Sequence, residues 1–237
     1  MTDIVFEKAT IGYLRTKPLI VDVDLVLKPG LHILLGPNGS GKSALLKTVA
    51  GLISPLYGRV LVDGIEPYKE RRRKVAAVVG ITWQDPYYGF VEPTVRDEVN
   101  LILRQLRARG NTDVADRLVP QQLWDRDPFS LSGGEAKRVS LASVLVADQP
   151  VWLLDEPFDN LDLDGVRRVS EIVREGKQRG KNIVVALHNP FYLEVVESDS
   201  VLIVDKDKRS LDVFKGGEVD DSVLERYGVL SRRMICR

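Results

Sequence analysis

The feature that most constrains the fold is the octapeptide GPNGSGKS, residues 36–43. LHILL before it has the composition of a buried strand, and SALLKTVA at its end reads as a helix. In such a loop the glycines let backbone N–H groups turn inward around a phosphate, while Lys42 reaches the outer phosphates and Ser43 offers a hydroxyl to Mg²⁺. The following helix points its positive end at the same anion. Strand, loop and helix therefore predict a nucleotide-binding α/β fold; the alternative is a plain glycine-rich turn.

Composition excludes several classes of partner. The chain has 237 residues with 34 basic and 34 acidic side chains, so nothing indicates bulk attraction to nucleic acid or to an acidic membrane. The basic run 69–74 (KERRRK) is interpreted as a solvated loop ahead of a strand. The lone Cys236 excludes an intrachain disulfide. The N-terminus lacks the features of a signal peptide and no apolar run approaches the ~18 residues that span a bilayer, so we expect a soluble protein able to dock on a membrane partner.

Hydrophobic patterns predict alternating strands and helices around a helical insertion. We expect strands at 3–8, 21–27, 31–35, 59–62, 75–82, 151–154 and 182–187, a closing hairpin at 201–204 and 210–214, and helices at 42–50, 95–109, 114–119, from the 131–135 motif to about 147, and at 163–178. The strand–helix–strand order from 151 to 187 implies a parallel sheet. One domain, 1–237, is predicted, with a core formed by 1–84 and 148–237 and an inserted helical subdomain at 85–147.

Two carboxylates end the predicted strand in VWLLDEP, residues 151–157. Asp155 at the strand tip is placed to hold Mg²⁺, directly or through water. Glu156 beside it is the natural residue to orient or deprotonate an attacking water. The alternative, a polar strand end capped by Pro157, is weakened by the phosphate loop upstream.

A second glycine-rich motif, LSGGE at 131–135, precedes a predicted helix. Ser132 and Glu135 match a capping box, in which the two side chains satisfy the first N–H groups of the helix. A capping box does not require two glycines, and Gly133 and Gly134 open the backbone to close approach by a ligand. The two interpretations are compatible, because a capping hydroxyl that accepts from an N–H can also donate to a phosphate oxygen.

GPNGSGKS, LSGGE and VWLLDEP, in this order, resemble the ATP-binding-cassette (ABC) ATPases, and the resemblance covers essentially the whole chain. It implies a P-loop NTPase (RecA-like) core with an N-terminal antiparallel β region and an inserted α-helical subdomain. It also implies ATP and Mg²⁺ as cofactors and a head-to-tail pair of ATPase subunits. Each ATP would lie between the phosphate loop of one subunit and the LSGGE of the other.

The same resemblance assigns further positions. Tyr13 is similar to the aromatic residue that stacks on adenine, Gln84 to the glutamine that senses the γ-phosphate, and His188 to the histidine that contacts it. Residues 158–162 (FDNLD) resemble a loop that communicates across the dimer. Without the resemblance, Tyr13 would be interpreted as a core aromatic, Gln84 as a loop residue and His188 as a structural histidine. The segment 158–162 would be interpreted as a helix cap.

The residues expected to carry the site fall into three groups. The expected catalytic residues are Glu156, His188, Gln84 and Lys42. The expected metal ligands are Ser43, Gln84 and Asp155. The expected ATP-binding residues are Tyr13, Gly36, Pro37, Asn38, Gly39, Ser40, Gly41, Lys42, Ser43, Ala44, Ser132, Gly133, Gly134 and Glu135. Two departures from the family pattern stand out: Glu135 occupies a place where glutamine is common, and Asn189-Pro190 follows His188 as a cap and first helical residue.

Three functions are compatible with these motifs. The resemblance favours the ATPase subunit of an ABC transporter, peripheral on the cytoplasmic face of the cell membrane and bound to integral membrane subunits. WQDP, EPTVRDEV and LSGGEAKRVSLASVLV most resemble the energy-coupling-factor type, which imports vitamins and transition-metal ions. The aromatic residues of QDPYYGF, 84–90, either line a groove for a helix of the membrane subunit or pack the hinge. The alternatives are a soluble, non-transport ABC ATPase of the iron–sulfur assembly type and a small-molecule P-loop kinase, which fits the first motif only.

Overall fold

The computed structural model describes residues 2–231 and centres on a mixed sheet of six strands in the order β5-β6-β7-β3-β8-β9. Its bounds are β5 Val79–Ile81, β6 Val151–Asp155, β7 Asn182–Ala186, β3 Gly30–Leu35, β8 Ser200–Asp205 and β9 Ser210–Lys215. The strands from β5 to β8 run parallel, and β9 pairs with β8 as an antiparallel hairpin. The sheet thus places the carboxyl ends of β3, β6 and β7 at one edge, which is where α/β folds bind ligands.

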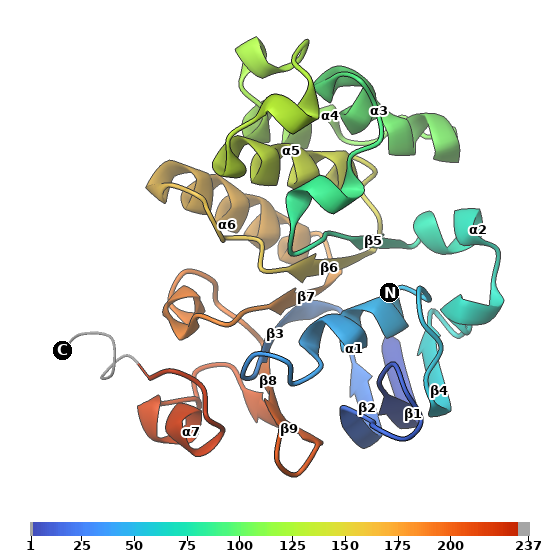
Figure 1. Ribbon diagram of the computed structural model, residues 1–237, viewed down its shortest axis with the longest axis vertical. Coiled ribbons are helices and arrows are strands. Elements are labelled where there is room, and N and C mark those ends of the chain that lie inside the picture. Colours follow the sequence, from blue (N-terminus) through green and yellow to red (C-terminus); the bar gives the residue numbers. More distant parts are fainter. Residues whose placement is uncertain (1, 232–237) are drawn as a thin grey trace.

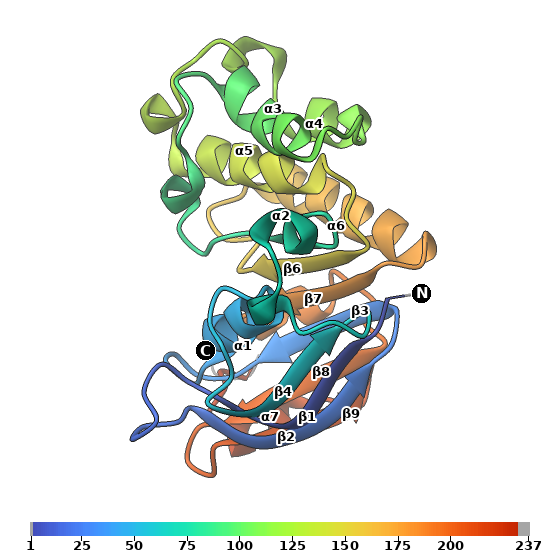
Figure 2. The ribbon, with the colours of Figure 1, turned by 90° about the vertical axis from the view of Figure 1, so that its right-hand side faces the viewer.

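A second, antiparallel sheet lies below the first and encloses helix α1, Lys42–Val49 (Figures 1 and 2). Its order is β2-β1-β4, with β1 Ile4–Ile11, β2 Ile20–Leu27 and β4 Tyr57–Val62. Side chains from both sheets and from α1 form one apolar cluster. The predicted N-terminal antiparallel region is confirmed, and its role is to bury the outer face of the helix that follows the phosphate loop.

Helices cover the opposite face of the central sheet and extend beyond it (Figure 1). The long helix α6, Leu163–Gln178, lies against the sheet, and α3 Val95–Leu106, α4 Thr112–Leu118 and α5 Gly133–Leu145 pack together above it. Short helical turns lie in the connections between elements: η1 Pro67–Lys69, η2 Pro86–Gly89, η3 Gln121–Leu123, η4 Pro128–Ser130 and η5 Pro190–Leu193. The helix α7, Asp221–Arg226, which the sequence patterns did not predict, follows β9.

One predicted strand is wrong in its first half. The run 75–82 begins as the end of helix α2, Arg72–Ala76, and only Val79–Ile81 pair with β6. An apolar run of this length does not distinguish a buried strand from a helix, and tertiary pairing decided where β5 starts. The same helix takes in part of the basic run 69–74, which we had interpreted as a loop. Cys236 lies outside the described residues.

Candidate functional site

The phosphate loop leaves β3 and enters α1 as predicted, with its backbone curled at its glycines. Gly41 has a φ of 112°, and a Cβ there would lie 3.0 Å from the Cβ of Leu19. At Gly36, φ is 154° and a Cβ would lie 2.7 Å from the Ser40 hydroxyl. Glycine is required at both positions by conformation and by space. The loop with Tyr13, Gln84 and Glu156 lines a cavity of about 220 Å³.

Lys42 folds back over its own loop. Its Nζ donates to the carbonyl oxygens of Gly36 at 2.7 Å and Pro37 at 3.5 Å, and the side chain is buried. Burial lowers the pKa of Lys42, while the nearby carboxylates of Glu156 and Asp155 act in the opposite direction. An ammonium group held by two neutral carbonyls inside a loop of this shape exchanges those bonds for charged phosphate oxygens at a gain, because charge-assisted bonds are the stronger ones.

Asp155 ends β6 beneath the loop, and the Ser43 hydroxyl is hydrogen-bonded to its carboxylate. Burial raises the pKa of Asp155, and the bond from Ser43 and the charge of Lys42 partly offset that rise. Both side chains line a wider cleft of about 720 Å³ together with Gln84. A hydroxyl, a carboxylate and an amide oxygen are the hard oxygen donors that Mg²⁺ prefers, so the residues present fit this ion.

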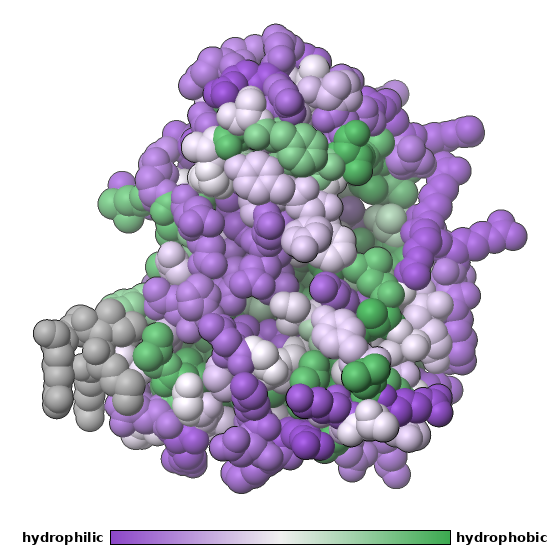
Figure 3. Space-filling view, viewed as in Figure 1, coloured by the Kyte–Doolittle hydropathy of each residue, from purple (hydrophilic) through white to green (hydrophobic). Residues whose placement is uncertain are grey.

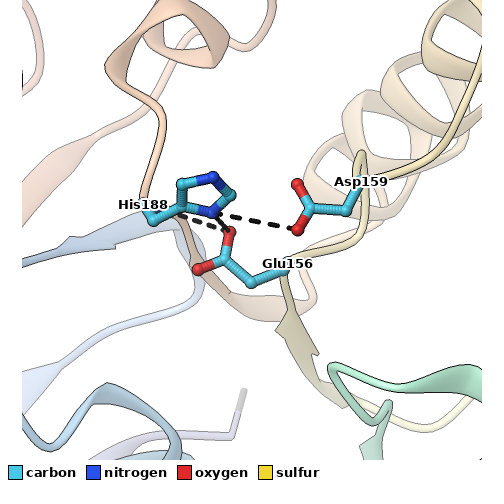
Figure 4. A group of neighbouring side chains, drawn as sticks. All are labelled: Glu156, Asp159 and His188. Carbon is cyan, nitrogen blue, oxygen red and sulfur yellow. Dashed lines mark hydrogen bonds and ion pairs between the residues drawn. The ribbon is translucent and has the colours of Figure 1, made fainter. Parts of the chain in front are cut away.

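Glu156 and His188 form a close pair at the ends of neighbouring strands β6 and β7 (Figure 4). The backbone N–H of His188 donates to Glu156 Oε2 at 3.0 Å, and His188 Nδ1 lies 2.9 Å from the same oxygen. Asp159 Oδ2 lies 3.8 Å from that ring nitrogen. Glu156 is 3% exposed, and burial raises its pKa, although the bonds from His188 oppose this. A buried carboxylate with a raised pKa is suited to accept a proton near neutral pH.

The backbone of Glu156 supports a functional interpretation. Its φ is 50°, in the left-handed region that residues other than glycine seldom occupy. Such conformations cost about 1–3 kcal/mol and persist where the surrounding structure over-determines them. Here the N–H of Glu156 donates to the Ala186 carbonyl of β7 at 3.0 Å, which holds the carboxylate beside His188.

Tyr13 lies at the mouth of the small cavity rather than in the core. Its side chain is 57% exposed and lines the same cavity as the phosphate loop. Lys47 Nζ lies 6.0 Å from the centre of the Tyr13 ring and 5.7 Å from that of Trp83. An exposed ring beside a phosphate cradle is available for stacking on a base. Lys47 and Trp83 were not predicted, although Lys47 lies four residues after Ser43 and hence on the same side of α1.

LSGGE forms the capping box that its spacing predicts. Glu135 Oε2 accepts from the Ser132 N–H and hydroxyl, each at 2.8 Å, and the Glu135 N–H donates to Ser132 Oγ at 3.4 Å. The two glycines differ: a Cβ on Gly134 would lie 2.7 Å from the Asn160 carbonyl, whereas Gly133 is exposed and has more room. Gly134 is therefore explained by packing within the chain, and Gly133 leaves the helix N-terminus accessible.

The structure brings most, but not all, of the predicted site residues together. Lys42, Ser43, Gln84, Asp155, Glu156 and His188 surround the phosphate loop, and Tyr13 stands at its edge. Gly133 lines only the wider cleft, which Ser43 also lines, and the small cavity around the loop is lined without any residue of LSGGE. Asp162 caps α6 and Asn189 caps η5, as their local patterns predict.

Apolar side chains gather on the upper part of the molecule, where Figure 3 shows a hydrophobic band over the helical elements. Tyr88 is 81% exposed and Val91 72%, while Tyr87 and Phe90 pack with Phe129. Within the segment 84–90, Tyr87 and Phe90 therefore pack, whereas Tyr88 stays exposed. A groove of about 290 Å³ runs beside it between β5, α3 and α5. Within residues 2–231, the helices are all too short or too polar to cross a bilayer.

Comparison with known proteins shows which family this chain resembles. Residues 20–159 match the family model described as "ABC transporter". A putative ABC transporter ATP-binding protein of Pyrococcus furiosus is 35% identical over 95% of this chain and 89% of its own. The energy-coupling factor transporter ATP-binding protein EcfA2 of Thermotoga maritima is 34% identical over 89% of this chain and 79% of its own. The solved structure of CbiO1 from Clostridium perfringens, described as part of the ABC transporter complex CbiONQ, is 25% identical with a TM-score of 0.73, covering 98% of this chain and 96% of that one.

Proposed function

This chain belongs to the ABC transporter family and is an ATP-binding, ATP-hydrolysing subunit of that kind, and we propose that it works as half of a head-to-tail dimer. The predicted P-loop NTPase architecture with its additional β and helical regions agrees with the fold of these proteins. The division into a core and a helical subdomain at 85–147 stays a proposal, consistent with α3, α4 and α5 packing mainly on one another.

The observation that carries the dimer proposal is that the small cavity around the phosphate loop is lined without any residue of LSGGE. The small cavity around the phosphate loop contains the groups needed to hold and hydrolyse a triphosphate, namely Lys42, Ser43, Gln84 and Glu156. Ser132 and Gly133 instead lie exposed at the N-terminus of α5, where backbone N–H groups and the helix dipole favour an anion. A second subunit supplies the anion if the two copies pack head to tail.

The hydrolytic chemistry follows from the positions of three side chains. Lys42 and the loop N–H groups hold the outer phosphates, and Glu156 orients a water in line with the γ-phosphate and accepts its proton. His188, fixed to Glu156 through Nδ1, has its other ring nitrogen left to contact the γ-phosphate. The reaction needs no covalent intermediate, since positioning and charge stabilisation account for most phosphoryl-transfer catalysis.

Mg²⁺ would be held by Ser43, Gln84 and Asp155. When bound, the ion neutralises charge on the phosphate oxygens. Asp155 is suited to this role because it is buried at the tip of β6 and already hydrogen-bonded to Ser43.

The cellular role we propose is transport, with the chain peripheral on the cytoplasmic face of the cell membrane and bound to integral membrane subunits. The relatives named as energy-coupling-factor ATPases, and the CbiO1 structure, support this over the soluble iron–sulfur assembly type. They also support the energy-coupling-factor type suggested by the sequence around Gln84. The groove between β5, α3 and α5 is lined by Gly89, the chain neighbour of exposed Tyr88, and offers the membrane subunit a docking surface.

Mixing two inactive variants tests the composite site. Lys42→Ala and Ser132→Ala each remove ATPase activity from a homodimer, because both of its sites are then defective. A heterodimer of the two variants keeps one complete site, so the mixture should recover measurable ATPase activity, with about a quarter of the wild-type value as the upper limit from random pairing. Steady-state ATPase assays of each variant alone and of the 1:1 mixture measure this. Thermal denaturation of Ser132→Ala controls for the lost helix cap. A mixture as inactive as its components would show that both motifs serve the same chain.

A further inference from the structure

Two contacts fasten the segment that carries Gln84 to the LSGGE motif of the same chain. Lys137, two residues after LSGGE, donates from Nζ to the Gln84 carbonyl at 2.9 Å and to the Trp83 carbonyl at 3.4 Å. The Tyr87 hydroxyl donates to the carbonyl of Leu131, the first residue of LSGGE, at 2.8 Å. The segment 83–87 is thus tied to both sides of the motif.

Lys137 is unusual because it is a cation in the interior. It is 1% exposed and ranks among the largest fully buried side chains of the described residues. Burial lowers its pKa, while the carboxylates of Asp159, Asp155, Glu156 and Asp85 act in the opposite direction. Burying an ammonium group costs free energy unless it is hydrogen-bonded and near opposite charge, and Lys137 meets both conditions at this place.

Lys137 donates to main-chain carbonyl oxygens, so the contact positions the backbone of the segment that carries Gln84. Gln84 lines both the small cavity at the phosphate loop and the wider cleft beside it, and its side chain is exposed to both. The bond from Lys137 to its carbonyl fixes the Gln84 backbone to α5. The η2 turn that follows Gln84 also packs directly on α5, so the whole segment follows this helix.

We propose that Lys137, with Tyr87, couples the two ATP sites of the dimer. ATP bound by the partner engages LSGGE at the N-terminus of α5; Lys137 on that helix then places Gln84 in this chain's own phosphate site. Lys137 is a positioning residue that touches no substrate. The proposal rests on the head-to-tail dimer of the proposed function, and it assigns a route within one chain from the partner's nucleotide to its own.

Lys137→Met tests the coupling, because methionine keeps the apolar stem and removes the donor. In the full-length chain we expect wild-type affinity for a fluorescent ATP analogue, a kcat lowered by about threefold to thirtyfold, and a Hill coefficient for ATP that falls to 1. Tyr87→Phe removes only the hydroxyl and leaves the ring packed against Phe90 and Phe129, so a smaller loss in the same direction is expected.

Lys181→Met is the matched control. Lys181 is also buried, at 7% exposed, and its Nζ donates to two carbonyls, those of Asp148 and Gln149, at 2.7 Å each, at the opposite ends of β6 and β7. This variant should lose comparable stability on thermal denaturation and retain the wild-type Hill coefficient.

The outcomes separate the coupling from the dimer itself. Three results would each overturn the coupling. The Lys137→Met protein could keep the cooperativity of the wild type, the wild-type protein could itself have a Hill coefficient of 1, or Lys181→Met could lose as much cooperativity as Lys137→Met. A wild-type chain that never dimerises with ATP would instead contradict the proposed function. That result would be visible by size-exclusion chromatography before any variant is compared.

Discussion

Single side chains determine whether the groups expected to bind phosphate are free to do so, and Ser132 shows this most clearly. Its hydroxyl carries one proton, which it donates to Glu135 Oε2 at 2.8 Å. That proton is not available to a phosphate oxygen while the bond lasts. The bonds from the Ser132 N–H and hydroxyl lower the pKa of Glu135, so the carboxylate stays charged at neutral pH. The acid at this position therefore competes with a phosphate for Ser132 and repels it by charge.

Glu135→Gln should strengthen the ATP-bound dimer. The amide oxygen can still accept from the Ser132 N–H, while the negative charge near the partner's phosphates is lost. We expect half-maximal dimer formation at an ATP-analogue concentration roughly threefold to tenfold lower, the effect of removing one like charge at short range in a wet interface. Size-exclusion chromatography with a non-hydrolysable analogue measures it.

Glu135→Ala serves as the control for the helix cap, since it removes both the charge and the two bonds that Ser132 donates to the carboxylate. Its melting temperature should fall by the equivalent of about 1 kcal/mol, the usual value of a cap. Dimerisation of Glu135→Gln at an unchanged or higher analogue concentration would show that the charge of Glu135 does not oppose the phosphate.

At the scale of elements, β3 is anchored through His32, which the sequence patterns did not single out. Its Nδ1 lies 2.8 Å from the Ser200 hydroxyl at the start of β8, and its Nε2 lies 2.8 Å from the Lys28 carbonyl after β2. A neutral ring can donate to the carbonyl and accept from the hydroxyl. Burial lowers the pKa of His32, so the folded protein favours this neutral form.

This burial predicts an acid-sensitive contribution to stability. Because the pKa of His32 is lower in the folded chain than its ordinary value of 6.5, its contribution is complete above about pH 6.5 and is lost as the pH falls through the lowered value. His32→Gln should unfold more readily at pH 7.5, by about 1 kcal/mol for the altered bonds, and show a weaker loss of stability between pH 7.5 and 5.5. Urea denaturation at both pH values measures the difference.

The chain offers a matched control, because His188 is its only other histidine. Its side chain is 42% exposed, so His188→Gln controls for the replacement of a histidine that is not buried. Equal flattening of the pH dependence in both variants would assign the effect to groups other than His32.

At the scale of the whole molecule, the helical elements expose apolar side chains that are not packed into the hydrophobic core. Tyr88, Val91 and Phe129 are each more than half exposed, and they belong to η2, the loop after it and η4. Exposed apolar side chains that gather on one region indicate a contact with another protein or a membrane. The proposed membrane subunit is the partner that fits, since the groove lined by Gly89, the chain neighbour of Tyr88, runs between the core sheet and α3.

Replacing Tyr88 and Val91 by serine should release the chain from its membrane partner. Large apolar side chains at the centre of an interface often contribute 1–2 kcal/mol or more, so about tenfold less of the double variant should co-purify from detergent-solubilised membranes. Val213→Ser, at a 48% exposed position on β9, is the control and should co-purify like the wild type. Unchanged recovery of the double variant, or recovery of the wild type only with soluble proteins, would contradict this docking surface.

What the sequence determined by itself was local. The phosphate loop, the capping box, the carboxylates after β6 and helix α6 follow from glycine placement, polar spacing and periodicity over a few residues, and all of them have the predicted secondary structure. The fold class was also predicted from the sequence, and the P-loop architecture is confirmed. A strand, a phosphate loop and a helix in this order are compatible with few other folds.

Only the tertiary structure decided which groups meet. Strand β3 lies between β7 and β8, and β6 is separated from it by β7, an order that long-range pairing selects and no local pattern records. That order places His188 against Glu156 and brings Lys137 from α5 under the carbonyl of Gln84. The start of β5 inside an apolar run was likewise set by its pairing with β6. Local propensities act over a few residues, whereas the contacts from His188 to Glu156 and from Lys137 to Gln84 join residues separated by 32 and 53 positions in the chain.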